Sequence, residues 1–288
     1  MPTADTAATM SACESVAETA DNVELLLQDV RFHPSPAWAI GEIVILSLFY
    51  FVCVWIINPY ILDPGVMQFV VISSVLMAIY YIWFSPCMIH GDAPDERGLG
   101  ERHTFFVRMD NLAPALRLFG TSSLVMGASL IIGALMVNPG MFSQINWRLV
   151  CVKQCLYLSW ASFQGLLFFG FFMVRLRGVV PMDGRGGAEM LSRHRLTVVF
   201  ITALIFSVFH MPNLPMMGLT LVGGFAWGWI YYQYPNLLAL VLSHSVIGTI
   251  LNQVIHLNMR AGPSYWTPDR YVIRMIFPFI AQWMSPGQ

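Results

Sequence analysis

Long, uninterrupted runs of apolar residues constrain the fold of this chain more than any other feature of its sequence. A helix needs roughly 20 apolar residues to cross the hydrocarbon core of a bilayer. Lipid offers no hydrogen-bond partner to an open backbone, so membrane-spanning runs of this kind are expected to be helical. The sequence therefore predicts an all-α, polytopic transmembrane helix bundle of about seven to eight spans. Seven spans are expected at about residues 37–58, 66–86, 118–137, 149–174, 195–216, 217–234 and 237–256, and the shorter apolar piece 271–284 would be the eighth.

The composition agrees with a membrane protein and excludes a nucleic-acid-binding one. Of the 288 residues, 57% are hydrophobic and only 11% are charged, whereas a soluble domain has about a quarter charged residues. The net charge is −1, and Lys153 is the single lysine. Because the chain has no strongly basic surface, nucleic acid is not expected among its partners. Membrane lipids are expected among its partners.

Shifts in composition divide the chain into four segments. Residues 1–36 are polar and acidic and are predicted to be a disordered tail. Residues 37–148 hold the first transmembrane helices, with an amphipathic loop at 87–117. Residues 149–256 form a second set of spans, and residues 257–288 form a C-terminal segment with the candidate last span.

The arginines predict the orientation of the bundle. If the loops are assigned alternately to the two sides, the side of the N-terminus receives most of the arginines, and the positive-inside rule makes it the cytoplasmic side. The expected location is a cytoplasmic membrane with the N-terminus in the cytoplasm. The arginine-rich side has Arg31, Arg97, Arg102, Arg108, Arg117, Arg175, Arg177, Arg185, Arg193 and Arg195, and the other side has Arg148, Arg260 and Arg270.

Polar residues inside the predicted spans are the first candidates for function, because such groups are expensive to bury in hydrocarbon. Glu42 and Lys153 lie near predicted span ends, where long side chains can reach the interface, so we expect both of them to be structural or interfacial. The candidates in the predicted spans are Glu42, Gln68, Lys153, Gln154, Gln164, His210, His244, Asn252 and His256.

Three of these residues are expected at similar depths on three different spans. With a rise of about 1.5 Å per residue, His210 lies roughly 20 Å, Gln164 roughly 16 Å and His244 roughly 12 Å from the arginine-rich side. The depths predict a shared polar site. Gly224 and Gly228, four residues apart, are expected to allow close packing of helices beside it.

Two motifs that contain these histidines resemble those of a known family. Residues 206–210 read Phe-Ser-Val-Phe-His, and residues 244–248 read His-Ser-Val-Ile-Gly, with a glycine-rich stretch between them. They are similar to the Phe-x-x-x-His and His-x-x-x-Asn motifs of the CAAX protease and bacteriocin-processing family of intramembrane proteases. Gly248 stands where that family has asparagine. The resemblance extends from about Phe163 to Leu251 and identifies residues 149–256 as a CAAX-protease-like core.

The first motif of that family, Glu-Glu-x-x-x-Arg, is degenerate in this chain. Residues 164–170 read Gln-Gly-Leu-Leu-Phe-Phe-Gly and align with Glu-Glu-Leu-Leu-Phe-Arg-Gly. A second stretch, Glu189 to Arg193, keeps Glu-x-x-x-Arg, but it lies in a glycine-rich loop and close to His210 in sequence. We favour the alignment at Gln164, with the residues around 179–191 as an insertion.

The resemblance implies an intramembrane endopeptidase that hydrolyses peptide bonds of membrane-associated or lipid-modified substrates, in a prokaryotic cytoplasmic membrane. In the family, the glutamate acts as general base on a water molecule, while the histidines and the asparagine orient that water and stabilise the oxyanion. Gln164 can bind water but cannot accept its proton, so the base would be His210, His244 or Glu189 folded back towards them. The predicted catalytic residues are His210, His244 and Gln164, with Glu189, Arg193, Phe206, Gly248 and Asn252 as secondary candidates.

The sequence leaves other functions open. No cofactor is required by the glutamate-and-water mechanism, but His210 and His244 with a carboxylate would form a three-ligand zinc site, for which Glu189 is the candidate third ligand. A catalytically inactive relative could instead serve as a membrane binding, chaperone or immunity protein. A transporter has less support, because the sequence shows neither an inverted repeat nor a pair of discontinuous helices.

Overall fold

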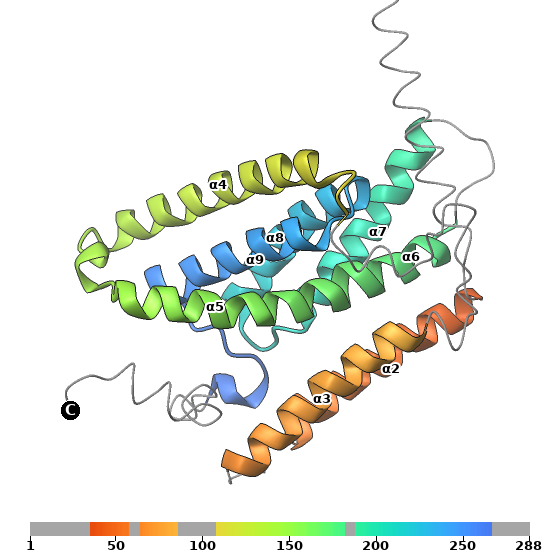
Figure 1. The fold of residues 1–288 in the computed structure, drawn as a ribbon, viewed down its shortest axis with the longest axis horizontal. Helices are drawn as coiled ribbons and strands as arrows, with labels where there is room; N and C mark the ends of the chain where they lie inside the picture. The colour runs from red at the N-terminus through yellow and green to blue at the C-terminus, as the bar shows by residue number, and fades with distance from the viewer. Residues whose placement is uncertain (1–34, 58–63, 86–107, 182–187, 267–288) are drawn as a thin grey trace, which may run out of the picture.

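The computed structural model describes residues 35–57, 64–85, 108–181 and 188–266, which form helices and no strand (Figure 1). Three of the helices continue through a π-helical segment. The helices are α2 (Pro36–Phe51, continued by Val52–Ile57), α3 (Pro64–Phe84), α4 (Leu112–Val137), α5 (Trp147–Gln164, continued through Gly165–Phe172 into α6, Met173–Val179), α7 (Ala188–Val208), α8 (Leu214–Gln233) and α9 (Leu237–Thr249, continued by Ile250–Val254).

The helices confirm the predicted all-α membrane bundle. Each of the seven spans predicted between residues 37 and 256 corresponds to a helix, although the span expected at 195–216 ends earlier, at Val208. The tail, most of the loop 87–117 and the candidate span 271–284 lie outside the described residues. Five helical stretches are long and apolar enough to cross a membrane, and α3 has a shorter apolar stretch, Phe69–Phe84. The five are Pro36–Ile57, Leu112–Val137, Trp147–Val179, Leu191–Val208 and Leu237–Val254.

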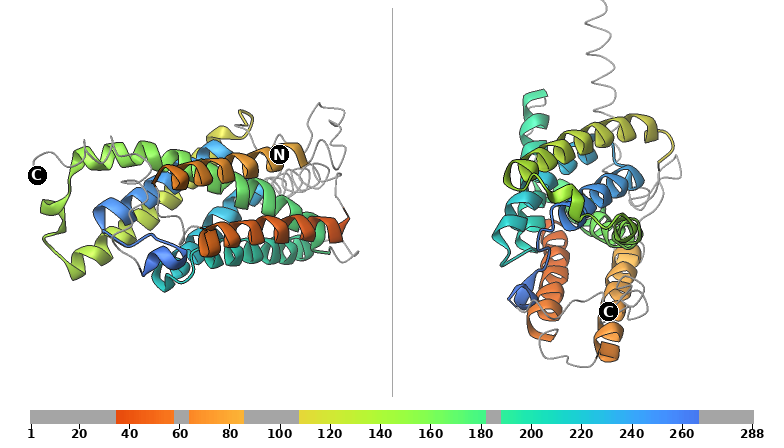
Figure 2. Two further views of the ribbon diagram at one scale, coloured as in Figure 1. Left: turned by 90° about the horizontal axis from the view of Figure 1, so that it is seen from below. Right: turned by 90° about the vertical axis from the view of Figure 1, so that its left-hand side faces the viewer.

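The helices are arranged as a core bundle with a separate pair against one side. Helix α9 packs against both α4 and α5, while α7 packs along α8. Helices α2 and α3 lie below this bundle in Figure 1, one in front of the other, and the right-hand view of Figure 2 also shows both of them beneath it. The pair joins the bundle through contacts of α2 with α6 and of α3 with the π-helical segment Gly165–Phe172.

Aromatic residues and glycines fill the centre of the bundle. Phe168, Phe169, Phe171 and Phe172 are all buried in the segment that joins α5 to α6. A Cβ atom at Gly224 would lie 3.0 Å from Cδ1 of Phe206, and one at Gly228 would lie 3.1 Å from a methyl group of Val199. Helices α7 and α8 therefore approach closely along these glycines, as predicted.

Glu42 is buried in a structural ion pair rather than exposed at the interface. Its side chain is only 1% exposed, and its Oε2 atom lies 2.6 Å from Nε of Arg175, which is equally buried. The hydroxyl groups of Ser85 and Tyr81 donate hydrogen bonds to Oε1. The sequence position near the start of α2 suggested snorkelling, but α3 and α6 cover this face of α2 and supply partners for the carboxylate.

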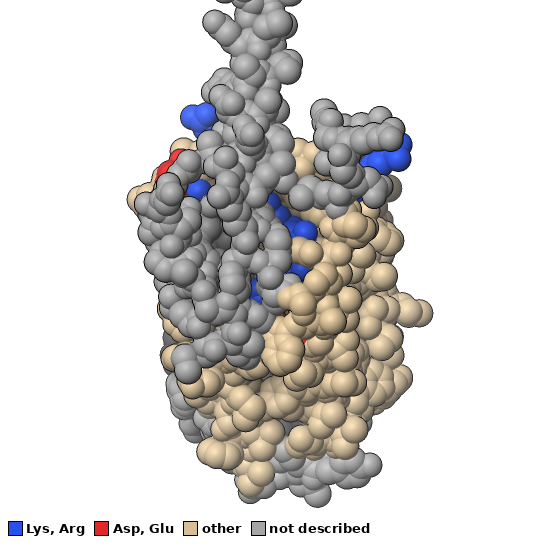
Figure 3. Space-filling view, turned by 90° about the vertical axis from the view of Figure 1, so that its right-hand side faces the viewer, with Lys and Arg blue, Asp and Glu red and all other residues tan. Residues whose placement is uncertain are grey.

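The arginines of the described residues gather at one end of the bundle. Helices α4 and α7 begin at this end and α6 ends there, and Figure 3 shows blue basic side chains there, above a face of mostly uncharged residues. The arginine-rich end has Arg108, Arg117, Arg175, Arg177, Arg193 and Arg195, while Arg148 lies in the first turn of α5 at the other end and Arg260 follows α9.

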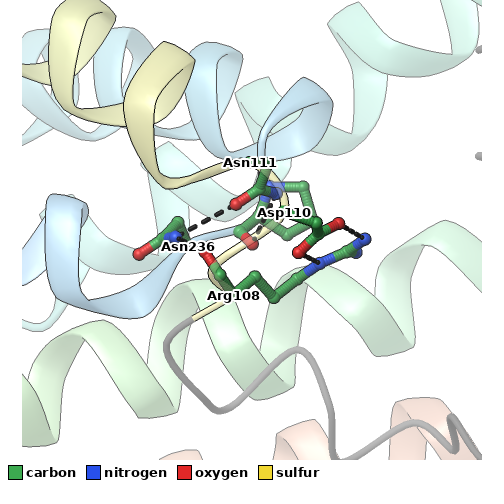
Figure 4. A network of polar contacts seen from close by, with 5 residues as sticks. Arg108, Asp110, Asn111 and Asn236 are labelled. Carbon is green, nitrogen blue, oxygen red and sulfur yellow. Dashed lines mark hydrogen bonds and ion pairs between the residues drawn. The ribbon is translucent and has the colours of Figure 1, made fainter.

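A polar network at the arginine-rich end joins the segment before α4 to the turn between α8 and α9 (Figure 4). Nδ2 of Asn236 donates to the carbonyl oxygen of Arg108 over 2.7 Å and to Oδ1 of Asn111 over 3.0 Å. Asn236 also caps α9, because its Oδ1 accepts from the amide of Ala239. The guanidinium group of Arg108 pairs with Asp110 over 2.6 Å and lowers the pKa of that carboxyl group. These contacts fix where α9, which carries His244, enters the bundle.

Candidate functional site

His210 lies in the turn between α7 and α8, at the centre of the bundle. Its Nδ1 atom is 2.8 Å from the carbonyl oxygen of Phe206. A carbonyl oxygen can only accept, so Nδ1 must carry the proton in this bond. In the neutral ring Nε2 then keeps its lone pair and can accept a proton.

The turn that carries His210 is held from the side of α2. The hydroxyl group of Tyr50 donates to the carbonyl oxygen of Phe209 over 2.6 Å. The two aromatic rings are stacked, with centroids 4.3 Å apart. Helix α2 therefore fixes the peptide group that immediately precedes His210.

The chain after α9 holds the same turn from a second direction. The amide of Gly262 donates to the carbonyl oxygen of Met211 over 2.6 Å. The side-chain amide of Asn213 donates to the carbonyl oxygens of Asn258 and Arg260. The backbone around His210 is thus fixed on both sides of the residue.

His244 lies on α9 and shares an aromatic neighbour with His210. The ring of Phe206 is 5.1 Å from the ring of His210 and 5.7 Å from that of His244. The ring of Trp227 packs against His244 from α8, at 4.7 Å. His244 is 4% exposed, and its Nδ1 atom has no hydrogen-bond partner among the described residues. A buried imidazole nitrogen of this kind is suited to bind a ligand or a water molecule.

Both histidines line one small cavity. Its volume is about 40 Å³, and a polar cavity of more than about 10–15 Å³ can hold a water molecule. The polar part of its wall consists of His210, His244, Tyr157, Thr220 and Trp227, and the rest is apolar. The structure therefore places the two histidines where one buried water molecule or reacting group could contact both.

Contacts between α5 and α9 define how these two helices are aligned. A Cβ atom at Gly248 would meet the ring of Tyr157, and one at Gly165 would meet Leu237, Leu240 and Val241. The helices are thus antiparallel, and each step forward along α5 corresponds to one step back along α9.

This register places Gln164 near His244 but on a different level. His244 is level with Ala161, so Gln164 lies three residues, roughly 4.5 Å, towards the arginine-rich end, and Tyr157 lies four residues, roughly 6 Å, towards the other end. Gln164 is buried at the end of α5, but it is not among the residues that line the cavity. Tyr157 is the α5 residue that does.

Tyr157 is not among the site residues predicted from the sequence. It lies seven residues, or about two helical turns, before Gln164 and therefore on the same face of the helix. That spacing could have pointed to it, but a tyrosine in an apolar span is indistinguishable from a packing residue in the sequence. Its ring explains Gly248, because a Cβ atom at position 248 would overlap the ring of Tyr157. No side chain fits at 248 while Tyr157 keeps this position.

The secondary candidates lie at varying distances from the cavity. Phe206 packs against both histidines, whereas Asn252, one turn beyond Gly248, accepts from Nζ of Lys153 over 3.5 Å. Glu189 lies in the first turn of α7 rather than in a loop, and Arg193 is exposed one turn later. About 20 helical residues separate Glu189 from the turn of His210, which corresponds to roughly 30 Å. The side chain of Glu189 lies outside the described residues.

The described residues do not provide the donor set of a catalytic zinc site. Such a site takes three protein ligands, in most cases histidines with a carboxylate or thiolate. Within the described ranges, no group of three or more histidine, cysteine, aspartate or glutamate residues lies close enough together to hold a metal ion. His210 and His244 are two imidazoles, and no carboxylate of the described residues lines their cavity.

Comparison with known proteins gives one match. Residues 112–250, from α4 to the end of α9, match the family model described as type II CAAX prenyl endopeptidase Rce1-like. No curated protein and no solved structure matches the chain significantly. The match covers the helices that enclose the histidine cavity, and it agrees with the resemblance of the motifs at residues 206–210 and 244–248. The segment 112–250, just under half of the chain, is therefore similar to the CAAX protease and bacteriocin-processing family of intramembrane proteases, with a degenerate first motif.

Proposed function

We propose that this integral membrane protein is an intramembrane endopeptidase that hydrolyses a peptide bond in membrane-associated or lipid-modified peptides. The observation that carries the proposal is the buried cavity of about 40 Å³ lined by both His210 and His244. Family members of this type are hydrolases, and amide hydrolysis requires a base for water together with a donor for the oxyanion. The cavity provides candidates for both.

We assign the general base to His210. The bond from its Nδ1–H to the carbonyl oxygen of Phe206 leaves Nε2 able to accept a proton from water. The water oxygen then adds to the scissile carbonyl carbon, and the imidazolium returns the proton to the leaving amine. This role replaces the glutamate that the family resemblance leads one to expect at Gln164. Gln164, one turn from the level of His244, would bind water or substrate without taking the proton.

A second cavity supports an apolar substrate. It has a volume of about 430 Å³, lies between α4 and the end of α9, and shares Leu130, Leu219 and Leu251 with the histidine cavity. Apart from Ser129, Asn138 and His256, its wall is apolar. A lipid chain or an apolar peptide segment lying there would adjoin the histidines.

Peptidase activity is tested with the full-length protein in lipid nanodiscs and an internally quenched, farnesylated peptide with a free carboxyl terminus. His210→Ala should lower the cleavage rate by about 10²-fold or more, because general-base help alone contributes 10²–10⁴-fold. His244→Ala should lower it by a similar factor, because Nδ1 of His244, unpartnered among the described residues, can position the water molecule in the cavity. His194→Ala is the matched control, since His194 is a buried histidine that bonds Tyr232 and lines neither cavity.

Full cleavage by the folded double variant His210→Ala/His244→Ala would contradict the proposed site. Wild-type protein that binds the peptide without cleaving it would contradict the peptidase and support a non-catalytic binding role. That non-catalytic function is suggested by Gln164, Gly165 and Gly248, which stand where the family motifs have two glutamates and an asparagine.

A further inference from the structure

The oxyanion of amide hydrolysis needs a hydrogen-bond donor in the cavity, and most donors in its wall are already bonded. The hydroxyl group of Thr220 donates to the carbonyl oxygen of Met216 over 2.7 Å. The indole N–H of Trp227 donates to Ser243 over 2.9 Å. The Nδ1–H of His210 is bonded to Phe206. None of these three groups can turn to a substrate without losing a bond of good length.

The hydroxyl group of Tyr157 is bonded much more weakly. Its contact is with the sulfur of Met259, at 3.9 Å, and a thioether is a poor acceptor. Tyr157 and Met259 both line the cavity, so this hydroxyl group lies at the cavity wall. The ring meets that of His244 edge-on, with centroids 6.3 Å apart. A stronger acceptor that enters the cavity could take the hydrogen bond at the expense of a weak contact.

The position of this hydroxyl group is fixed by the fit of the ring against α9. The ring occupies the space that a side chain at position 248 would need. Preorganised donors stabilise a transition state because they need not reorient as charge develops. The lack of a side chain at Gly248 thus makes room for the ring of Tyr157, whose hydroxyl group is a fixed donor from the facing helix.

We propose that Tyr157 is a catalytic residue that donates a hydrogen bond to the oxyanion of the tetrahedral intermediate. This inference rests on the proposed peptidase function. Water adds to the scissile carbonyl carbon, the π pair moves onto the carbonyl oxygen, and the water proton passes to Nε2 of His210. Tyr157 stabilises the negative oxygen until the C–N bond breaks. The products are a carboxylate and an amine, which leaves with the proton from His210.

The direct test is Tyr157→Phe, which keeps the ring against Gly248 and removes the hydroxyl group. Loss of one oxyanion donor lowers kcat by about 10²–10³-fold, and KM for the farnesylated peptide should change by less than about threefold because the donor acts in the transition state. Tyr232→Phe is the control, since it removes another buried hydroxyl group, which bonds His194 outside the cavity. Full turnover in folded Tyr157→Phe, with inactive histidine variants, would overturn this inference alone.

A binding measurement separates this inference from the peptidase proposal. A peptidyl phosphonate of the same sequence mimics the oxyanion, so Tyr157→Phe should weaken its binding by about the same factor as kcat while the parent peptide binds equally well. Wild-type protein that neither cleaves the peptide nor prefers the phosphonate overturns both proposals.

An exchange of side chains across the α5–α9 contact gives a third test. Gly248→Asn alone should inactivate the protein, because the new side chain overlaps the ring of Tyr157. Tyr157→Ala removes the donor and opens the space, and Tyr157→Ala/Gly248→Asn should recover at least tenfold over Tyr157→Ala as the new amide supplies a donor. Equal activity of these last two variants would contradict the role assigned to this position.

Discussion

Individual residues in this protein differ from the family pattern in a coordinated way. The first motif has Gln164 and Gly165 in place of two glutamates, and the third has Gly248 in place of asparagine. Tyr157 lies against Gly248, and His210 has the tautomer of a base. The same two chemical needs, a proton acceptor and an oxyanion donor, can thus be met from other positions around the cavity.

Gln164→Glu tests how close the chain is to the family's chemistry. A carboxylate at this position would lie about one turn from the level of His244 and could take the water proton. We expect the cleavage rate to rise by about tenfold or more, measured with the farnesylated peptide. Gln154→Glu is the matched control on the same helix, because Gln154 bonds Ser245 and lies ten residues, roughly 15 Å, before Gln164 along α5. An unchanged rate in folded Gln164→Glu would contradict a place for Gln164 beside the reacting water.

At the scale of elements, the helices could be predicted from the sequence more accurately than the contacts between them. The apolar runs gave each of the seven helices between residues 37 and 256, because the hydrophobic length needed to cross lipid is a local property. The end of α7 was placed eight residues too late, since residues 209–216 are mostly apolar although they form the His210 turn and the start of α8. The ion pair of Glu42 could not be predicted, because it depends on α3 and α6, whose positions no local pattern reveals. Tyr157 was missed for the same reason.

The attachment of α2 to the bundle depends on the ion pair between Glu42 and Arg175. Arg175→Met leaves the Glu42 carboxylate buried without its charge partner, which typically costs about 3–5 kcal/mol of stability. The expected result is a lower midpoint of unfolding in detergent.

The double variant Glu42→Leu/Arg175→Met should recover most of that loss, because two apolar side chains replace both charges. Arg117→Met, at an exposed site on α4, should change the free energy of unfolding by less than about 0.5 kcal/mol. A single Arg175→Met variant as stable as wild type would show that the pair does not hold α2.

At the scale of the whole molecule, the unequal ends predict the orientation in the membrane. The arginine-rich end should face the cytoplasm, and the start of α2 lies at that end. In a cysteine-free background, Ser35→Cys should be protected from an impermeant maleimide in intact cells, while Asn138→Cys should react. Both residues are exposed at opposite ends of the bundle. The reverse labelling pattern would invert the proposed topology.

The bond from Tyr50 to the peptide preceding His210 has a consequence for how this protein can be divided or transplanted. Tyr50 and Gly262 both lie outside the segment 112–250 that carries the family similarity, yet they hold the two sides of one turn. The recognisable core is therefore not a self-sufficient module. A fragment or chimera restricted to this core would contain His210 without the residues that hold its turn in position. The smallest transferable unit therefore extends at least from α2 to residue 262.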